Sequence, residues 1–323
     1  MPHVRIAGRT PASSRALIAP PAVGFPGTPD PDPTPSRPKR TGEDMKRLAT
    51  RAALTVALLT LASATSLLGA AQASPVLPTL SLTLTKTSLA VGGTTQSGAV
   101  NVVSSATGTK EASAILFALK PGVTKAEVNA FLASKASRDP NASSKYGSIV
   151  FDAEVTPGQK SEAQTILQPG QYLALKGEGE GSPKSYVEFT VSAAPSPAAL
   201  PAPEATVRSI EFAFRGPTTL HDGELVRFEN EGYLVHMDFA LPTKSEKAAK
   251  ELVKALHAGK EKQAEKLVSG MPVGFAGPIS HGAFQQETIT AKPGWYVQVC
   301  FMETQDGRDH TLLGMERAFK IVK

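Results

Sequence analysis

The chain has 323 residues, a formal net charge of +5, 41% hydrophobic residues and a single cysteine. Residues 1–73 carry nine Lys or Arg and four Asp or Glu, so residues 74–323 carry 25 of each sign and are neutral. A neutral folded part does not favour nucleic-acid binding, which usually shows a basic patch. The lone cysteine excludes a disulfide within the chain.

The first segments of the chain are predicted to be non-structural. Residues 1–44 hold ten prolines and no periodic apolar pattern, so we expect a disordered tail or a misassigned upstream extension. Residues 45–73 have the positive start, the uncharged apolar run and the small-x-small end of a secretory signal peptide. A transmembrane anchor is the competing interpretation, disfavoured by the Ala, Thr and Ser content and the cleavage motif. We therefore expect Met45 to be the true start and the mature protein to be extracytoplasmic, that is secreted, periplasmic or cell-wall associated.

The remaining length, roughly 250 residues, suits two domains. The Pro/Ala-rich segment 192–205 is predicted to be a stiff linker between one domain at 74–191 and another at 206–323. The two halves share an order of patterns: an apolar strand, a capping box, a Pro-Gly turn before an aromatic strand, and a short closing strand. The two capping boxes are Thr124-x-x-Glu127 and Thr243-x-x-Glu246. We expect a tandem duplication.

Both halves consist mainly of short strand patterns between Gly and Pro breaks. This predicts a mainly β protein of two tandem Greek-key β-sandwiches, each with a short helical insertion. The insertion of the second half is expected from Lys244 to about Val268, divided into two helices at Gly259. The strands are predicted at 80–84, 99–103, 148–153, 164–167 and 186–191, and then at 207–214, 224–229, 234–241, 287–290, 295–300 and 318–322.

Four residues with metal-ligating side chains stand in a suggestive order. Cys300, His310 and Met315 follow one another near the end of the chain, and His236 lies upstream on another predicted strand. One thiolate, two imidazoles and a thioether are the ligands of a trigonal His₂Cys copper site with a weak axial Met. A metal would also protect an unpaired thiol from oxidation outside the cytoplasm. The alternative for this cysteine is a buried, inert thiol.

The second half resembles the cupredoxin family over most of residues 206–323. The resemblance rests on two motifs: Phe228-x-Asn230 followed by His236, and Pro293-Gly294-x-Tyr296-x-x-x-Cys300 followed by His310 and Gly314-Met315. It implies one type 1 copper, with His236, Cys300 and His310 as ligands and Met315 as the long axial ligand. It also implies that Asn230 braces the loop carrying the first His and the cysteine, and that His310, on an exposed loop, is the electron port.

The loop between Cys300 and His310 departs from the small cupredoxins. Its nine residues make it longer than theirs and close in length to the loop of the copper nitrite reductases. Asp306-Gly307 within it is a tight-turn signal, so we predict a hairpin that returns His310 to the cysteine. An enzyme like those reductases is disfavoured, because a second, catalytic copper would need more His ligands than the chain offers.

Other candidate residues are weaker. Met302 and His281 are alternative ligands, whereas His221, in a turn, and His257, on the predicted helix, are expected to face solvent. No G-x-S-x-G elbow or other nucleophile motif supports a hydrolase. The first half is expected to be a degenerate copy without metal ligands, because the alignment of the halves sets three residues without ligand chemistry in the ligand positions. These are Ala114 for His236, Lys176 for Cys300 and Ser185 for Met315.

The predicted function is that of a secreted cupredoxin-like protein that binds one copper and acts in electron transfer or copper handling. It would be an electron carrier or copper-binding protein rather than an enzyme, with an unknown redox partner and no membrane-spanning segment after signal cleavage. The main alternative is a metal-free extracytoplasmic β-sandwich that serves as a binding or structural module.

Overall fold

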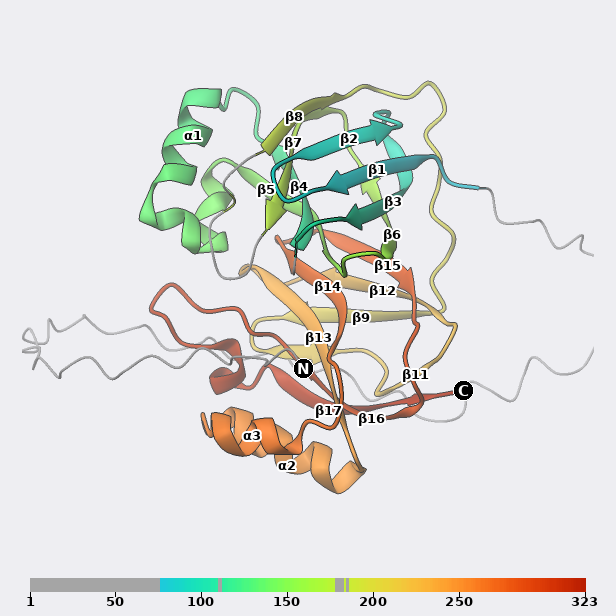
Figure 1. Ribbon diagram of the computed structural model, residues 1–323, viewed down its shortest axis with the longest axis vertical. Coiled ribbons are helices and arrows are strands. Elements are labelled where there is room, and N and C mark those ends of the chain that lie inside the picture. Colours follow the sequence, from blue (N-terminus) through green and yellow to red (C-terminus); the bar gives the residue numbers. More distant parts are fainter. Residues whose placement is uncertain (1–75, 110–111, 178–182, 184–185) are drawn as a thin grey trace, which may run out of the picture. The chain divides into compact units, whose positions relative to one another are not determined.

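The computed structural model describes residues 76–109, 112–177, 183 and 186–323, drawn as a coloured ribbon in Figure 1. The expected upstream extension, the expected signal peptide and Ser185 lie outside the described residues. The described residues all belong to one compact unit. In its described part, no helix is both long and apolar enough to cross a membrane.

The described part of the chain is mainly β, as predicted. The first half holds β1 (Thr79–Leu84), β2 (Leu89–Gly93), β3 (Gly98–Ala106), β4 (Ala112–Leu119), α1 (Lys125–Ala133), η1 (Lys135–Arg138), η2 (Pro140–Lys145), β5 (Gly147–Val155), β6 (Lys160–Leu167), β7 (Gly170–Gly177) and β8 (Tyr186–Val191). The second half holds β9 (Ala205–Ile210), β10 (Ala213–Arg215), β11 (Thr219–His221), β12 (Leu225–Asn230), β13 (His236–Thr243), α2 (Glu246–His257), α3 (Glu261–Leu267), β14 (Val273–Ile279), β15 (Phe284–Thr288), β16 (Gly294–Val299), η3 (His310–Leu313) and β17 (Glu316–Val322).

These strands form three sheets. The sheet β5-β4-β7-β8 belongs to the first half and the sheet β11-β17-β16-β13-β14 to the second. The third, in the order β10-β9-β12-β15-β6-β3-β1-β2, runs through both halves. Its two parts meet at the pair Gln164 and Gln286, whose side-chain amides are also joined by a 2.9 Å hydrogen bond. Each half is therefore a two-layered β-sandwich, as predicted, but one layer is shared.

The alternation of apolar residues along the strands builds a core in each half. In the first half, Leu80, Leu82 and Leu84 of β1 point to one face, as the two-residue period of a strand requires, and are fully buried in one cluster with Leu116 and Phe151. In the second half, three phenylalanines from both layers meet: Phe228 stacks on Phe275 at 5.0 Å between ring centroids, and Phe275 meets Phe319 edge-on at 6.3 Å.

The helices follow the predicted pattern with one correction. The capping box of α1 is confirmed: the Thr124 hydroxyl accepts the Glu127 N–H at 3.3 Å, and the Glu127 carboxylate accepts the Thr124 N–H at 2.9 Å. The box predicted at Thr243 is wrong. Thr243 ends β13, its hydroxyl donates to the carbonyl oxygens of Ser245 and Trp295, and Ser245 caps α2 instead. The division at Gly259 is confirmed, since its φ of 63° suits glycine and separates α2 from α3.

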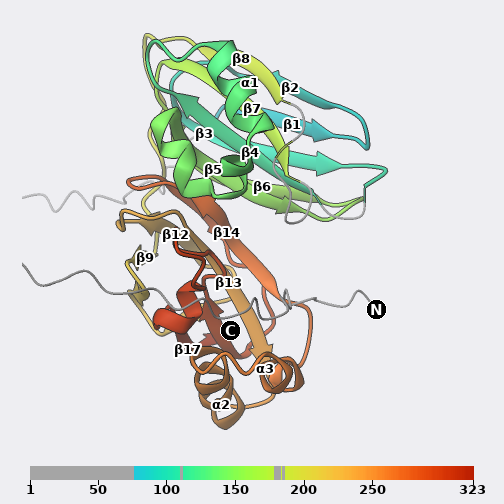
Figure 2. The ribbon, with the colours of Figure 1, turned by 90° about the vertical axis from the view of Figure 1, so that its left-hand side faces the viewer.

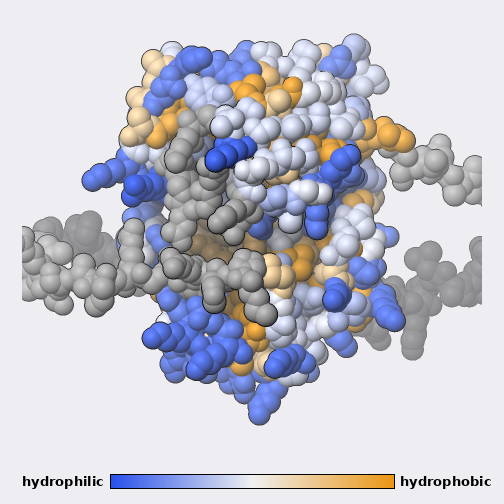
Figure 3. All heavy atoms as spheres, viewed as in Figure 1, coloured by the Kyte–Doolittle hydropathy of each residue, from blue (hydrophilic) through white to orange (hydrophobic). Residues whose placement is uncertain are grey.

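The helices α2 and α3 cover the outer face of the five-stranded sheet. Leu252 and Leu256 of α2 pack with Val297 and Val299 of β16 in a separate cluster. Figures 1 and 2 both show the two helices side by side, with α2 next to β17. Hydrophilic side chains gather over them at the bottom of the view in Figure 3, as expected for the solvent side of an amphipathic helix.

The segment predicted as a linker lies against the first sandwich. The N–H of Ala99 donates to the carbonyl oxygen of Ala198 at 2.9 Å, and the N–H of Ala194 donates to the Ser97 hydroxyl at 3.0 Å. Its Pro201 carbonyl oxygen accepts a hydrogen bond from the Gln286 side chain of the second half. Because a sheet runs through both halves, the boundaries at 74–191, 192–205 and 206–323, and the tandem duplication, remain predictions.

Candidate metal centre

Three of the four predicted ligands converge at one edge of the five-stranded sheet. His236 is the first residue of β13, and Cys300 follows the last residue of β16. The two strands are antiparallel neighbours, with Phe239 opposite Val299, so the start of one lies beside the end of the other. His310 begins η3 and returns to the same place.

The distances within this cluster suit a single ion. The Sγ of Cys300 lies 3.8 Å from Nδ1 of His236 and 3.4 Å from Nδ1 of His310. One donor atom from each residue lies within 4.8 Å of the other two, and the imidazole centroids are 4.9 Å apart. Donors bound at about 2.0–2.3 Å in a trigonal plane would be roughly 3.5–3.8 Å apart. The separations therefore fit a trigonal N₂S site.

The cluster is closed off from solvent. His236 is 1% exposed, and Cys300 and His310 are 0% exposed. Both Nε2 atoms are buried and lack a hydrogen-bond partner among the described residues. The expectation that His310 is an exposed electron port is wrong. The ring of Phe212, on the turn between β9 and β10, contacts the His310 ring edge-on at 5.2 Å and helps to cover it.

Burial sets the protonation of the three donors. It raises the pKa of the Cys300 thiol to about 12, although the N–H groups of Met237 and Met302 hydrogen-bond the sulfur and act in the opposite direction. Burial lowers the pKa values of His236 and His310 to about 4, against an opposing attraction from Glu211. At neutral pH both imidazoles are therefore neutral, and a metal ion would have to displace only the thiol proton.

Met315 is fully buried beside the cluster and is tied to two of its members. The Cys300 N–H donates to the Met315 carbonyl oxygen at 3.2 Å, and the Met315 N–H donates to the His310 carbonyl oxygen at 3.0 Å. Its side chain shares a hydrophobic cluster with Cys300 and Met302. The axial role of Met315 stays a prediction. His281 is not a member of the group of three, and its Nδ1 lies 2.9 Å from the Gly232 carbonyl oxygen.

Asn230 braces the segment before His236. Its amide donates to the carbonyl oxygens of Leu234 and Ile279, both at 2.8 Å, and accepts the N–H of Gly232 at 2.8 Å. These bonds tie the loop to the end of β14. Among the described residues, none of the hydrogen bonds of the Asn230 side chain reaches the segment that carries Cys300, although the resemblance implied such a brace.

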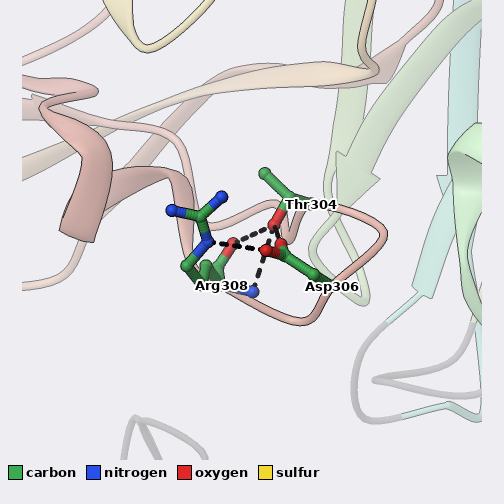
Figure 4. Close-up of polar contacts among 3 residues, drawn as sticks. All are labelled: Thr304, Asp306 and Arg308. Carbon is green, nitrogen blue, oxygen red and sulfur yellow. Dashed lines mark hydrogen bonds and ion pairs between the residues drawn. The ribbon is translucent and has the colours of Figure 1, made fainter. Parts of the chain in front are cut away.

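The loop between Cys300 and His310 is a hairpin, as predicted. Gly307, with φ of 78°, forms its turn, and Glu303 bridges Asp309. Figure 4 shows the side-chain hydrogen bonds that stabilise this hairpin. The Thr304 hydroxyl donates to the Asp306 carboxylate, which also accepts from Nε of Arg308 at 2.8 Å. The His310 N–H then donates to the Met302 carbonyl oxygen at 2.8 Å, which holds the histidine beside the cysteine.

The other residues singled out in the sequence lie elsewhere. His221 is exposed, as predicted, and so is His257, whose Nδ1 lies 3.2 Å from the carboxylate of Glu316. In the first half, Ala114 and Lys176 are paired across β4 and β7, and the buried Lys176 ammonium donates to the Thr85 carbonyl oxygen at 2.6 Å. An alanine side chain has no donor atom, and a lysine ammonium group has no lone pair to offer a cation.

Comparison with known proteins gives weak likenesses. No protein-family model and no curated protein matches the chain. Among solved structures, auracyanin B is 19% identical, with 39% of this chain and 94% of that chain covered and a TM-score of 0.24. Auracyanin A, described as a blue copper protein from Chloroflexus aurantiacus, is 20% identical over 36% and 96%, with a TM-score of 0.23. A Cu-containing nitrite reductase from Thermus scotoductus is 11% identical over 76% and 68%, with a TM-score of 0.22. TM-scores this low do not establish a common fold.

Proposed function

We propose that this protein is an extracytoplasmic, cupredoxin-like copper protein that carries single electrons. One copper ion would be bound by His236, Cys300 and His310, with Met315 as a weak axial ligand. The observation that carries the proposal is the convergence of the only cysteine on two buried imidazoles, at separations that fit one ion.

The chemistry of the donors supports copper. A thiolate with a nearby thioether is a soft set, and two imidazoles complete the ligands of a trigonal copper site. Copper would supply a one-electron couple there. The chain supplies the rest: paired strands hold His236 and Cys300, a locked hairpin holds His310, and burial keeps both imidazoles neutral. A frame this constrained favours electron transfer, since it limits rearrangement between oxidation states.

The location and the partner are also part of the proposal. The signal-like pattern of residues 45–73 supports export, and the redox partner is unidentified. Because Phe212 covers His310, electrons would enter or leave through the side chains that cover the cluster rather than through an exposed imidazole.

The test is to add one equivalent of Cu(II) to purified residues 74–323 and to record the visible absorption. A copper–thiolate site should produce an intense sulfur-to-copper charge-transfer band. Cys300→Ser should abolish the band, because the transition originates on that sulfur. Met315→Leu should keep the band and raise the reduction potential, because a weak axial ligand tunes the site more than it holds it.

Zn(II) serves as a control, because it can occupy the same site without producing a visible absorption band. Zn(II) should raise the thermal midpoint of the wild-type protein and should compete with copper, because any ion that binds only the folded state stabilises it. A colourless protein whose thermal midpoint does not change in excess copper would contradict the proposal and would favour the metal-free module.

A further inference from the structure

A residue of the first sandwich hydrogen-bonds both chain segments that carry the candidate ligands. Oδ1 of Asn141, in η2, accepts the N–H of Val235 at 2.7 Å, directly before His236. Nδ2 of the same amide donates to the carbonyl oxygen of Glu303 at 3.4 Å, in the hairpin between Cys300 and His310. One side chain thus joins the two segments whose spacing sets the distances between the three donors.

The orientation of this amide follows from its neighbours. The Val235 N–H can only donate, so it must face the oxygen of Asn141, and the Glu303 carbonyl can only accept, so it must face the nitrogen. Asp139 further restrains this side chain, because its Oδ1 accepts hydrogen bonds from the backbone N–H of Asn141 at 2.9 Å and from Nδ2 of Asn141 at 3.0 Å. Asn141 is buried, and a flipped amide would set two like groups against each other at each contact.

Contacts that do not involve Asn141 also join the two halves. The Ile149 N–H donates to the Ser280 hydroxyl at 2.9 Å, and the Ser280 N–H donates back to the Ile149 carbonyl oxygen at 2.9 Å. The shared sheet adds the pair Gln164 and Gln286. The loss of Asn141 therefore leaves the junction in place but removes the acceptor of a buried N–H next to His236, and such a group costs free energy when unpaired.

We infer that Asn141 is a positioning residue for the metal centre, supplied by the first sandwich. It holds the Val235–His236 segment and the Cys300–His310 hairpin in register, which is the connection that the Asn230 side chain does not make. The first sandwich then helps to position the ligands of the site. The inference deepens the proposed function and rests on it for the metal, but not for the placement of Cys300.

The test compares Asn141→Ala with a matched control, Ser143→Ala, in residues 74–323. Ser143 is in the same short helix and equally buried, but its hydroxyl donates only within the helix, to the Pro140 carbonyl oxygen at 2.6 Å. In the metal-free protein, the rate of Cys300 alkylation is measured with a small thiol reagent. Asn141→Ala should increase it about three- to tenfold over Ser143→Ala, because the loosened hairpin opens more often.

With copper, the dissociation constant, the electron paramagnetic resonance spectrum and the reduction potential are measured. Asn141→Ala should still bind copper, with a dissociation constant about ten- to a hundredfold higher and a changed spectrum, as is typical when a supporting hydrogen bond is removed. Ser143→Ala should match the wild type in all three.

The two arms separate the failure of this inference from the failure of the copper proposal. Faster alkylation in Asn141→Ala, with no copper bound by any variant, would support the positioning role and contradict copper binding. If Asn141→Ala behaves like Ser143→Ala in alkylation, and in every copper measurement where copper binds, the positioning role is overturned.

Discussion

Phe212 shows how one residue shapes the site. Among the described residues it is the single non-glycine with positive φ, at 56°, and its ring covers His310. An L-residue in the left-handed region costs about 1 kcal/mol or more, so the surroundings must hold it there. Its neighbour Glu211 helps to stabilise this conformation, because the Glu211 carboxylate accepts hydrogen bonds from the N–H groups of Tyr233 and Leu234. The strained turn thereby lies against the loop that leads to His236.

Replacing Phe212 by glycine should expose His310 without unfolding the protein. Glycine tolerates the positive φ, which offsets part of the lost ring contact. In the metal-free Phe212→Gly variant, a histidine-acylating reagent should modify His310, detected by peptide mass spectrometry, whereas His310 of the wild type should stay unmodified.

Tyr233→Ala serves as the control for this experiment. Tyr233 is 85% exposed and stacks on His281, with 5.5 Å between ring centroids, so its removal should change the reactivity of His281 and not of His310. An unreactive His310 in Phe212→Gly would show that other groups provide the cover.

At the scale of elements, strands place the ligands and helices support the strands. β13 and β16 bring His236 and Cys300 together, while α2 packs on β16 from the outside. The position of α2 depends on where β13 ends, because Thr243 is still part of the sheet and leaves the cap to Ser245. We therefore expect the Ser245 cap to affect the stability of the fold and not the candidate metal centre.

The Ser245→Ala variant should lower the free energy of unfolding by about 1 kcal/mol, the usual cost of losing an N-cap hydroxyl. The lost bond is the one from the Ala248 N–H to the Ser245 hydroxyl. Urea unfolding measures the loss, and Ser245→Asp should retain wild-type stability because aspartate also caps. Equal stability of the alanine and aspartate variants would rule out this role for Ser245.

For the molecule as a whole, the junction of the two halves carries a buried acid. Asp152 of β5 is 4% exposed, a Cβ on Gly277 of β14 would lie 2.6 Å from its Cγ, and one of its carboxylate oxygens lacks a hydrogen-bond partner among the described residues. Burial raises the pKa of this carboxyl well above its ordinary value, although a hydrogen bond from Ser113 opposes the shift. The folded protein therefore keeps a proton that the unfolded chain releases.

This proton linkage has a definite sign. Above a pH of about 4 the unfolded chain loses the Asp152 proton while the folded state retains it, so stability should fall as pH rises towards the folded pKa. Asp152→Asn should be more stable than the wild type at pH 7 and should lose less stability between pH 4 and 7. Part of the pH dependence of stability should remain in this variant, because burial also raises the pKa of Asp238, to about 7, and that of Glu287.

Urea unfolding at several pH values measures both proteins. Parallel curves for the wild type and Asp152→Asn would show that the proton on Asp152 does not affect folding. The comparison is independent of any metal, because it is made on the metal-free protein.

Most features that depend on neighbours along the chain could be predicted from the amino-acid sequence. Four such predictions are confirmed: the strand at 80–84, the capping box at Thr124, the break at Gly259 and the turn at Asp306-Gly307. Each of them reflects a local conformational preference. The order of the ligand-type residues and the resemblance to the cupredoxin family together predicted that His236, Cys300, His310 and Met315 converge, and the first three do.

Features that depend on residues far apart in the chain became visible only in the folded protein. The burial of His310 depends on Phe212, almost a hundred positions earlier, and Asn141 meets Val235 across the two halves. Neither role follows from a local pattern, because each contact joins residues that lie far apart in the chain. The sheet shared at Gln164 and Gln286 likewise follows from the docking of two surfaces. Such contacts form wherever packing places complementary groups together, and no local preference encodes that choice.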